Sequence, residues 1–147
     1  MAKKYQGLDN HETVVTYVVR AHNQVLEDFN LTRFVSLLEI VVNEGLFEDV
    51  SRIKQVNYKD LIPYVVEHDV YEAWLSAKRG AGQTIPVEIK HLLARRREFY
   101  LATREGKGQK LYDFHMFITP SCKEEYQAAL DYAKRRLKNS ESRSVLR

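Results

Sequence analysis

The chain has 147 residues, of which 44% are hydrophobic and 29% are charged, and these proportions are typical of one soluble globular domain. Its single cysteine, Cys122, excludes an intramolecular disulfide framework and favours a reducing, cytoplasmic location. The apolar runs are much shorter than the ~20 residues that a membrane-spanning helix needs, so no membrane association is expected.

The net charge of +3 is unevenly distributed. Residues 1–74 hold 7 Lys and Arg against 12 Asp and Glu, a net charge of −5, whereas residues 75–147 hold 16 against 8, a net charge of +8. The basic half of such a chain can bind an anion. The alternative is that the two halves attract each other, within one molecule or between two.

Two helices are predicted in the first third of the chain. The first begins near Asp9 and Asn10 and ends at Asn30, with one apolar face at helical spacing. The second covers residues 31–43, is apolar nearly all round and is followed by the terminating Gly45. We expect it to be the buried central helix of the fold, with a short helical piece over 46–53 after it.

Three further helices are predicted, over 60–79, over 84–106 and from Ser121 to about residue 138. Ser121 and Glu124 have the spacing of a capping box at the start of the last one. Residues 139–147 contain too few apolar side chains to pack. The sequence therefore predicts one helical domain over 1–138 and a flexible C-terminal tail over 139–147.

Between the last two helices, apolar residues alternate with others over 111–118, which is a strand-like pattern. No partner strand is evident, so the segment is interpreted as an extended connector, a strand completed by another chain or a helix with an ambiguous pattern. The predicted fold class is all-α, with about five helices around 31–43. Dimerisation through 111–118 is a further expectation.

The helix over 84–106 carries a basic stripe beside its apolar face. Its members recur every seven residues, close to two helical turns, so they span about 21 Å on one side. Such a stripe can follow a phosphate backbone, although a solvated face of ion pairs is the ordinary alternative. The predicted nucleic-acid contacts are Lys90, Arg97 and Arg104, assisted by Arg95, Lys107 and Lys110.

A protein interface is predicted from a second group of residues. Arg96 lies in the middle of the apolar stripe of the same helix, where a guanidinium must reach out to solvent, meet a carboxylate or lie at an interface. We expect it to meet a carboxylate of the acidic half. The aromatic residues of the strand-like segment, Tyr112, Phe114 and Phe117, complete the predicted interface.

The dipeptide formed by His68 and Asp69 is the one candidate for metal chemistry. It resembles the paired metal ligands of the HD phosphohydrolase superfamily, which is all-helical and uses the metal to activate water. That resemblance implies an upstream histidine, His11 or His22, and a downstream aspartate, Asp131, as further ligands. The glycine that usually follows the pair in that family is absent here.

These observations leave three functions open. The first is a small non-enzymatic protein that binds DNA or RNA through the basic helix. The second is a protein-interaction module, such as an adaptor, an inhibitor or a subunit of a larger complex. The third is a metal-dependent phosphohydrolase at His68 and Asp69. No cofactor is expected for either of the first two.

Overall fold

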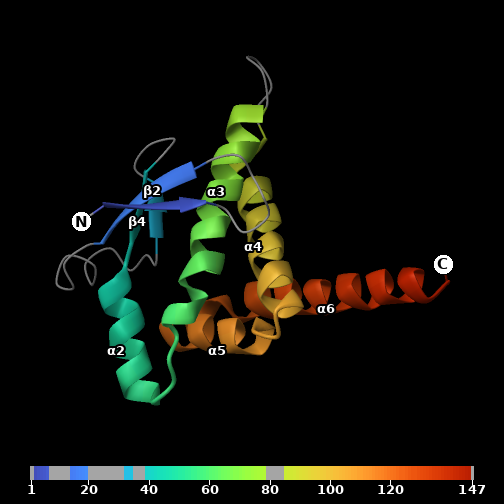
Figure 1. Ribbon diagram of the computed structural model, residues 1–147. Helices are drawn as coiled ribbons and strands as arrows, with labels where there is room; N and C mark the ends of the chain where they lie inside the picture. Colours follow the sequence, from blue (N-terminus) through green and yellow to red (C-terminus); the bar gives the residue numbers. More distant parts are fainter. Residues whose placement is uncertain (1, 7–13, 20–31, 35–38, 79–84, 147) are drawn as a thin grey trace.

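The computed structural model describes residues 2–6, 14–19, 32–34, 39–78 and 85–146, with side chains over 42–75 and 85–141. Within these residues, five α-helices build the body of the molecule (Figure 1) and confirm the all-α prediction. Two short 3₁₀ turns, Lys59–Leu61 and Pro120–Cys122, precede α3 and α6. The helices are α2 (Glu44–Lys54), α3 (Ile62–Lys78), α4 (Val87–Arg104), α5 (Gly108–Ile118) and α6 (Lys123–Leu146).

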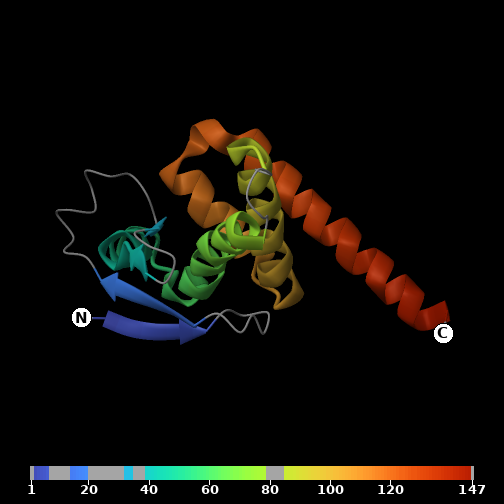
Figure 2. The same ribbon diagram turned by 90° about the horizontal axis from the view of Figure 1, so that it is seen from above.

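Four short strands lie beside α3 at the N-terminal side of this body (Figure 2). They form one mixed sheet in the order β1-β2-β4-β3, in which β2 and β4 are parallel and the outer pairs are antiparallel. The sheet reaches α3 through β3 and β4. The strands are β1 (Ala2–Gln6), β2 (Val14–Val19), β3 (Thr32–Phe34) and β4 (Glu39–Val42).

The prediction of a buried central helix over 31–43 is wrong, because β3 and β4 occupy this segment. The first predicted helix is also wrong over Val14–Val19, which is β2, and its other residues lie outside the described ones. Strands β2 and β4 contain runs of β-branched side chains, which lose side-chain freedom in a helix and pack well in a sheet. Periodicity does not distinguish a short buried strand from part of a buried helix.

The central position belongs to α4, which packs on α3, α5 and α6. Its sequence places small and large apolar residues on more than one side, and Ala94, Phe99, Leu101 and Ala102 are all buried. Helices α2, α3 and α4 follow the predicted pieces 46–53, 60–79 and 84–106 closely. At the start of α2, the Asn43 side chain accepts a hydrogen bond from the Leu46 amide at 2.9 Å.

Of the three alternatives left open for 111–118, the helix is correct and the strand is wrong, because this segment lies within α5. Leu111, Phe114 and His115 are buried at the spacings of one helical face, whereas the strand-like pattern comes from the alternation of Tyr112, Phe114, Met116 and Ile118. A tight turn joins α5 to α4. Gly106 has φ +79° there, a conformation that favours glycine, and the Lys107 amide donates to the Ala102 carbonyl at 2.7 Å.

Helix α6 continues to Leu146, so residues 139–146 have helical backbone where the sequence predicts a flexible tail. Its first half packs on α4 and α5, and its second half projects away from the body in both ribbon views (Figures 1 and 2). The side chains at 138–141 are exposed. Among the described helices, none is long and apolar enough to span a bilayer.

Candidate functional site

Two of the arginines predicted to contact phosphate, Arg95 and Arg97, point into the helical body. The Arg95 side chain is 12% exposed, and its guanidinium donates to Glu98 at 2.7 Å and to Glu125 at 3.1 Å. The guanidinium of Arg97 lies 3.3 Å from the fully buried carboxylate of Glu67. Both positive charges are therefore compensated inside the protein.

Two of the predicted lysines are also paired with an acid, and the third lies far from Arg104. Lys107 and Lys110, at the start of α5, both pair with Asp60, at 3.6 Å and 2.9 Å. Lys90 is half-buried in the first turns of α4, whereas Arg104 is exposed in its last turn, about 21 Å along the axis. The structure therefore does not bring the six predicted residues together on one surface.

An open groove of about 520 Å³ lies between the C-terminal half of α4 and the middle of α6. Tyr100 forms its α4 side, and its other lining residues come from consecutive turns of α6. They are Tyr132, Arg135, Arg136, Asn139 and Ser140.

Arginine side chains cover both tyrosine rings of this groove. The guanidinium groups of Arg136 and Arg104 lie 4.1 Å and 5.7 Å from the centre of the Tyr100 ring. Arg96 lies over the Tyr132 ring at 4.6 Å. Each contact is a cation–π pair, which holds an arginine in place without neutralising its charge. We call Arg96, Tyr100, Arg104, Tyr132, Arg135 and Arg136 the arginine groove.

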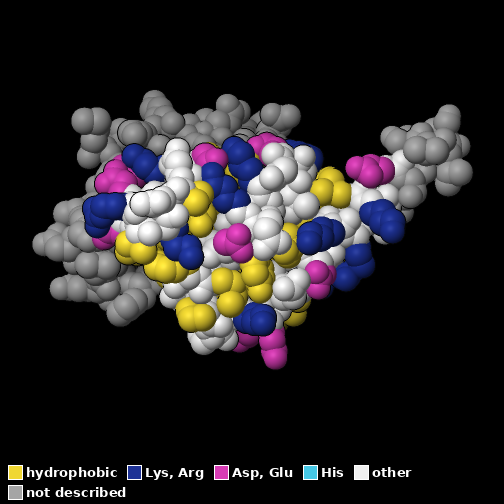
Figure 3. All heavy atoms as spheres, turned by 90° about the horizontal axis from the view of Figure 1, so that it is seen from below, with side chains coloured by type: hydrophobic (Ala, Val, Ile, Leu, Met, Phe, Trp, Pro, Cys, Tyr) yellow, Lys and Arg dark blue, Asp and Glu magenta, His cyan; other side chains and the backbone are white. Residues whose placement is uncertain are grey.

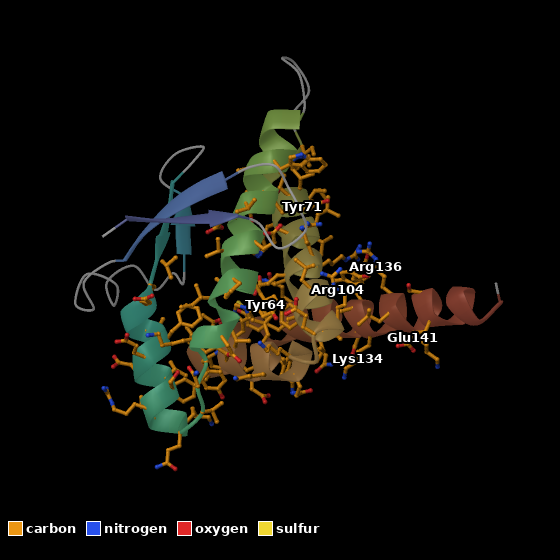
Figure 4. The ribbon with its side chains drawn as sticks, viewed as in Figure 1. Tyr64, Tyr71, Arg104, Lys134, Arg136 and Glu141 are labelled. Carbon is orange, nitrogen blue, oxygen red and sulfur yellow. The ribbon has the colours of Figure 1, made fainter. Side chains whose placement is uncertain are left out.

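The arginine groove differs from the paired cations in its lack of carboxylate partners among the described side chains. In the part of the chain whose side chains are described, no carboxylate lies within ion-pair distance of its four arginines. Arg136 lies on the side of α6 that faces Arg104 of α4, whereas Lys134 lies on the opposite side (Figure 4). Lysine and arginine side chains continue along the projecting part of α6 (Figure 3). Among the described residues, Arg96 contacts the ring of Tyr132 and not the expected carboxylate.

The predicted aromatic interface divides between core and surface. Phe114 is fully buried and stacks on Phe47 at a ring-centre distance of 4.6 Å, and Tyr112 packs against the same core. Phe117 is 43% exposed, with the ammonium group of Lys54 above its ring. Hydrophobic side chains gather on the underside, where α2 and α5 lie (Figure 3). A protein interface at this face remains a prediction.

A second feature is a group of ionisable side chains buried where α3, α4, α5 and α6 meet. At its centre, the fully buried Glu98 carboxylate contacts His68 Nδ1 at 3.0 Å, Arg95 at 2.7 Å and His115 Nε2 at 2.6 Å. Buried carboxylates require such partners, because desolvation alone is costly. We call the whole group the polar cluster: His68, Glu72, His91, Arg95, Glu98, His115 and Glu125.

The pKa values in the polar cluster follow from this arrangement. Burial alone would raise the pKa of Glu98, but Arg95 and His115 hold it well below its usual range. Burial and Arg95 oppose protonation of His68, yet its bonds to Glu72 and Glu98 raise its pKa to about 9. Burial lowers the pKa of His115, so its neutral ring donates from Nε2 to Glu98. Glu98 is thus ionised and held by three donors.

The outer part of the polar cluster lies nearer to solvent. His68 Nε2 is 2.7 Å from Glu72 Oε1, and His91 Nδ1 is 3.4 Å from the same oxygen. The second ring nitrogen of His91 contacts Glu125 at 2.5 Å. Burial would raise the pKa of Glu72, but the two histidines lower it to about 2. Within the described residues, His68, Glu72 and His91 are the group whose ligand atoms are close enough to share a metal ion.

This geometry changes the interpretation of the predicted metal pair. His68 belongs to a group of suitable ligands, but its neighbours there are Glu72 and His91, and Asp69 is not a member. Asp131 is on α6, where it accepts a hydrogen bond from Gln127. His11 and His22 lie outside the described residues. The ligand pattern implied by the phosphohydrolase resemblance is therefore not assembled in the described part of the chain.

Sequence reasoning missed most residues of both features. For the arginine groove the available signal was the run Lys134–Arg136 with Tyr132 one helical turn before Arg136. For the polar cluster the signals were the four-residue spacing of His68 and Glu72 and a glutamate, Glu98, between apolar neighbours of α4. Neither signal shows which helices will meet.

Because comparisons with known proteins found no match, the function is inferred from this geometry. No protein-family model, no curated protein and no solved structure matches the chain.

Proposed function

We propose that this protein binds nucleic acid through the arginine groove, with Arg104, Arg135 and Arg136 contacting phosphates. One observation carries the proposal: Arg135 and Arg136 line the groove, Arg104 lies over the ring of Tyr100, and none of the three has a described carboxylate partner. In contrast, Arg95, Arg97, Lys107 and Lys110 are paired with carboxylates inside the fold or at its edge. A cluster of uncompensated arginines is the electrostatic footprint of a polyanion site.

The side chains of the groove can contact both the phosphate and the base of a nucleotide. A guanidinium group matches two phosphate oxygens with a planar pair of donors, and it keeps its charge under all physiological conditions. Tyr100 and Tyr132 hold guanidinium groups against their rings. Unpaired bases stack on guanidinium planes and on aromatic rings, with little sequence preference. A volume of about 520 Å³ falls within the range of small-ligand sites. The proposal therefore favours single-stranded over double-stranded nucleic acid.

The charge distribution supports the same assignment. Residues 75–147 carry a net charge of +8, and much of the uncompensated part lies on α6, where Lys134, Arg135, Arg136 and Lys138 are exposed. The second half of α6 projects beyond the body (Figure 1). A nucleic acid seated in the groove could follow α6 outward, away from the described part of the acidic half.

The proposal is tested by measuring the binding of labelled single- and double-stranded DNA and RNA across a salt series. The three phosphate contacts predict a log–log salt slope of about −2 for single strands. The variant Arg104→Gln/Arg135→Gln/Arg136→Gln should bind at least about 30-fold more weakly and flatten the slope to about zero. Its fold is checked by circular dichroism.

A matched control removes the same net charge from paired positions. In Lys59→Gln/Lys107→Gln/Lys110→Gln the lysines lost are those that pair with Glu48 and Asp60. This variant should bind nearly as tightly as the wild type. Equal losses in both triple variants would show that only net charge matters, and the groove assignment would then be wrong.

A protein partner is the second candidate, and one observation favours it. Phe117, Ile53 and Val56 are 43%, 61% and 40% exposed on α5 and at the end of α2. Exposed apolar side chains that lie together often mark interaction sites. Wild-type protein that binds no nucleic acid above background at low salt would favour this candidate, and Phe117→Asp would then be expected to abolish capture of the partner.

A further inference from the structure

The outer part of the polar cluster is not used by the proposed function, and its geometry is unusual for a purely structural ion pair. Two imidazole rings from different helices, His68 on α3 and His91 on α4, converge on one carboxylate oxygen of Glu72. The ring centres lie 5.0 Å apart with an angle of 68° between the planes. One nitrogen of each ring faces the same small space.

The other nitrogen of each ring is held by a separate carboxylate. His68 Nδ1 contacts Glu98 at 3.0 Å, and His91 Nε2 contacts Glu125 at 2.5 Å. Histidines that bind metals typically donate their second ring N–H to a carboxylate or carbonyl, which fixes the tautomer and the orientation of the ring. Both histidines of this cluster have that arrangement, each with its own carboxylate.

We propose that His68, Glu72 and His91 bind a divalent transition metal of the zinc type, with Glu98 and Glu125 positioning the two imidazoles. Two ligand atoms at about 2.1 Å from a tetrahedral ion lie about 3.4 Å apart. His91 Nδ1 and Glu72 Oε1 are 3.4 Å apart, and all three ligand atoms lie within 4.8 Å of one another. Side-chain movements of about an ångström suffice to complete the site.

The ligand types select the class of ion. Two imidazoles and one carboxylate suit Zn²⁺, Co²⁺ or Fe²⁺, whereas Mg²⁺ and Ca²⁺ prefer oxygen ligands alone. The side chains of Glu72 and His91 are 34% and 42% exposed, and that of His68 is 9% exposed. An ion can therefore enter from solvent, and water can occupy the fourth position, as in sites with three protein ligands.

The charges of the polar cluster also fit a divalent ion. Its three carboxylates, Glu72, Glu98 and Glu125, face one guanidinium, that of Arg95. With neutral imidazoles this leaves a formal charge of −2, which a divalent cation balances. The bound ion takes the place of the protons that the two histidines otherwise direct at Glu72.

The test titrates chelator-treated full-length protein with Co²⁺ and with Zn²⁺. We expect one saturable site per chain, a Co²⁺ absorption spectrum of tetrahedral or five-coordinate type, and a Zn²⁺-dependent rise in the melting temperature. His91→Ala and Glu72→Gln should each weaken Zn²⁺ binding about 100-fold or more. Glu125→Gln, which removes a positioning carboxylate but none of the three ligands, should weaken it about 10- to 100-fold.

Glu124→Gln is the matched control, because Glu124 is an exposed carboxylate next to Glu125. It should leave the Zn²⁺ affinity unchanged. His91 is partly exposed, so His91→Ala is expected to fold, and Glu72→Gln provides a second test at a different helix. A Co²⁺ spectrum typical of six water ligands, or equal Zn²⁺ affinity in the wild type, His91→Ala and Glu72→Gln, would overturn the metal site. Neither result depends on nucleic-acid binding.

Discussion

The polar cluster and the arginine groove share helix α4, yet the arginines of α4 are paired with carboxylates in the first and not in the second. Arg95 and Arg97 of α4 turn inward and meet the buried carboxylates of Glu98 and Glu67. Arg96, between them, turns to the ring of Tyr132 and keeps its charge. The difference shows that a cation is available to a ligand when it has no carboxylate partner, and that its presence in a basic run does not decide this.

The energetic consequences of the two arrangements also differ. A buried ion pair contributes little net stability when intact, because desolvation offsets the attraction, but the loss of one partner leaves a charge stranded in the core. An exposed cation over an aromatic ring can be lost at small cost to folding. Substitutions in the polar cluster should therefore mainly lower the stability of the fold, whereas substitutions in the arginine groove should mainly weaken binding.

The largest effect on folding is expected at the centre of the polar cluster. Glu98→Gln removes the carboxylate that His68, Arg95 and His115 share, and we expect the free energy of unfolding to fall by about 3–5 kcal/mol. Urea unfolding followed by circular dichroism measures it. Glu124→Gln, at an exposed position of α6, should change stability by less than about 0.5 kcal/mol. A loss below about 1 kcal/mol in Glu98→Gln would contradict this role for Glu98.

The helices of the body were largely predictable, and the reasons are local. Helix α4 has an apolar face at helical spacing, and α3 ends in basic residues followed by glycine, signals that lie within one segment. The strands β2 and β4 were mistaken for helices, because short β-branched runs fit both structures until their neighbours are known. The sequence leaves the segment of α5 open between strand, connector and helix, because Phe114 belongs both to the alternating apolar residues and to the buried helical face with Leu111 and His115.

The sites were less predictable, because each depends on which helices meet. Helical angles place Arg95 and Arg97 beside an apolar face, but they do not show that Glu125 and Glu67 come from other helices to neutralise them. Arg104 was predicted on the binding surface and lies at the arginine groove. His68 was singled out with its sequence neighbour, whereas its partner His91 is on another helix.

An intermediate effect is expected from pH, in metal-free protein with chelator present. The folded-state pKa of His68 is raised from 6.5 to about 9. The stabilisation of the fold by its protonated ring is therefore fully present below pH 6.5 and is lost as pH rises through 9. We expect the free energy of unfolding to decline by on the order of 2 kcal/mol across this window. His68→Gln should remove that part of the decline. Parallel pH profiles of the two proteins between pH 6.5 and 9 would contradict the assignment.

The smallest effect on folding is expected at Arg96. Because Arg95 is its direct neighbour, a comparison of the two residues is the sharpest test of the difference between the arginine groove and the polar cluster. Arg96→Met removes a cation from above the Tyr132 ring and leaves no described carboxylate unpaired, so it should cost about 0.5–1 kcal/mol. Arg95→Met strands Glu98 and Glu125 and should cost about 3 kcal/mol or more. Thermal melting of both variants measures the difference. Equal losses would mean that Arg96 also compensates a buried charge, and that the arginine groove contains fewer available cations than its geometry indicates.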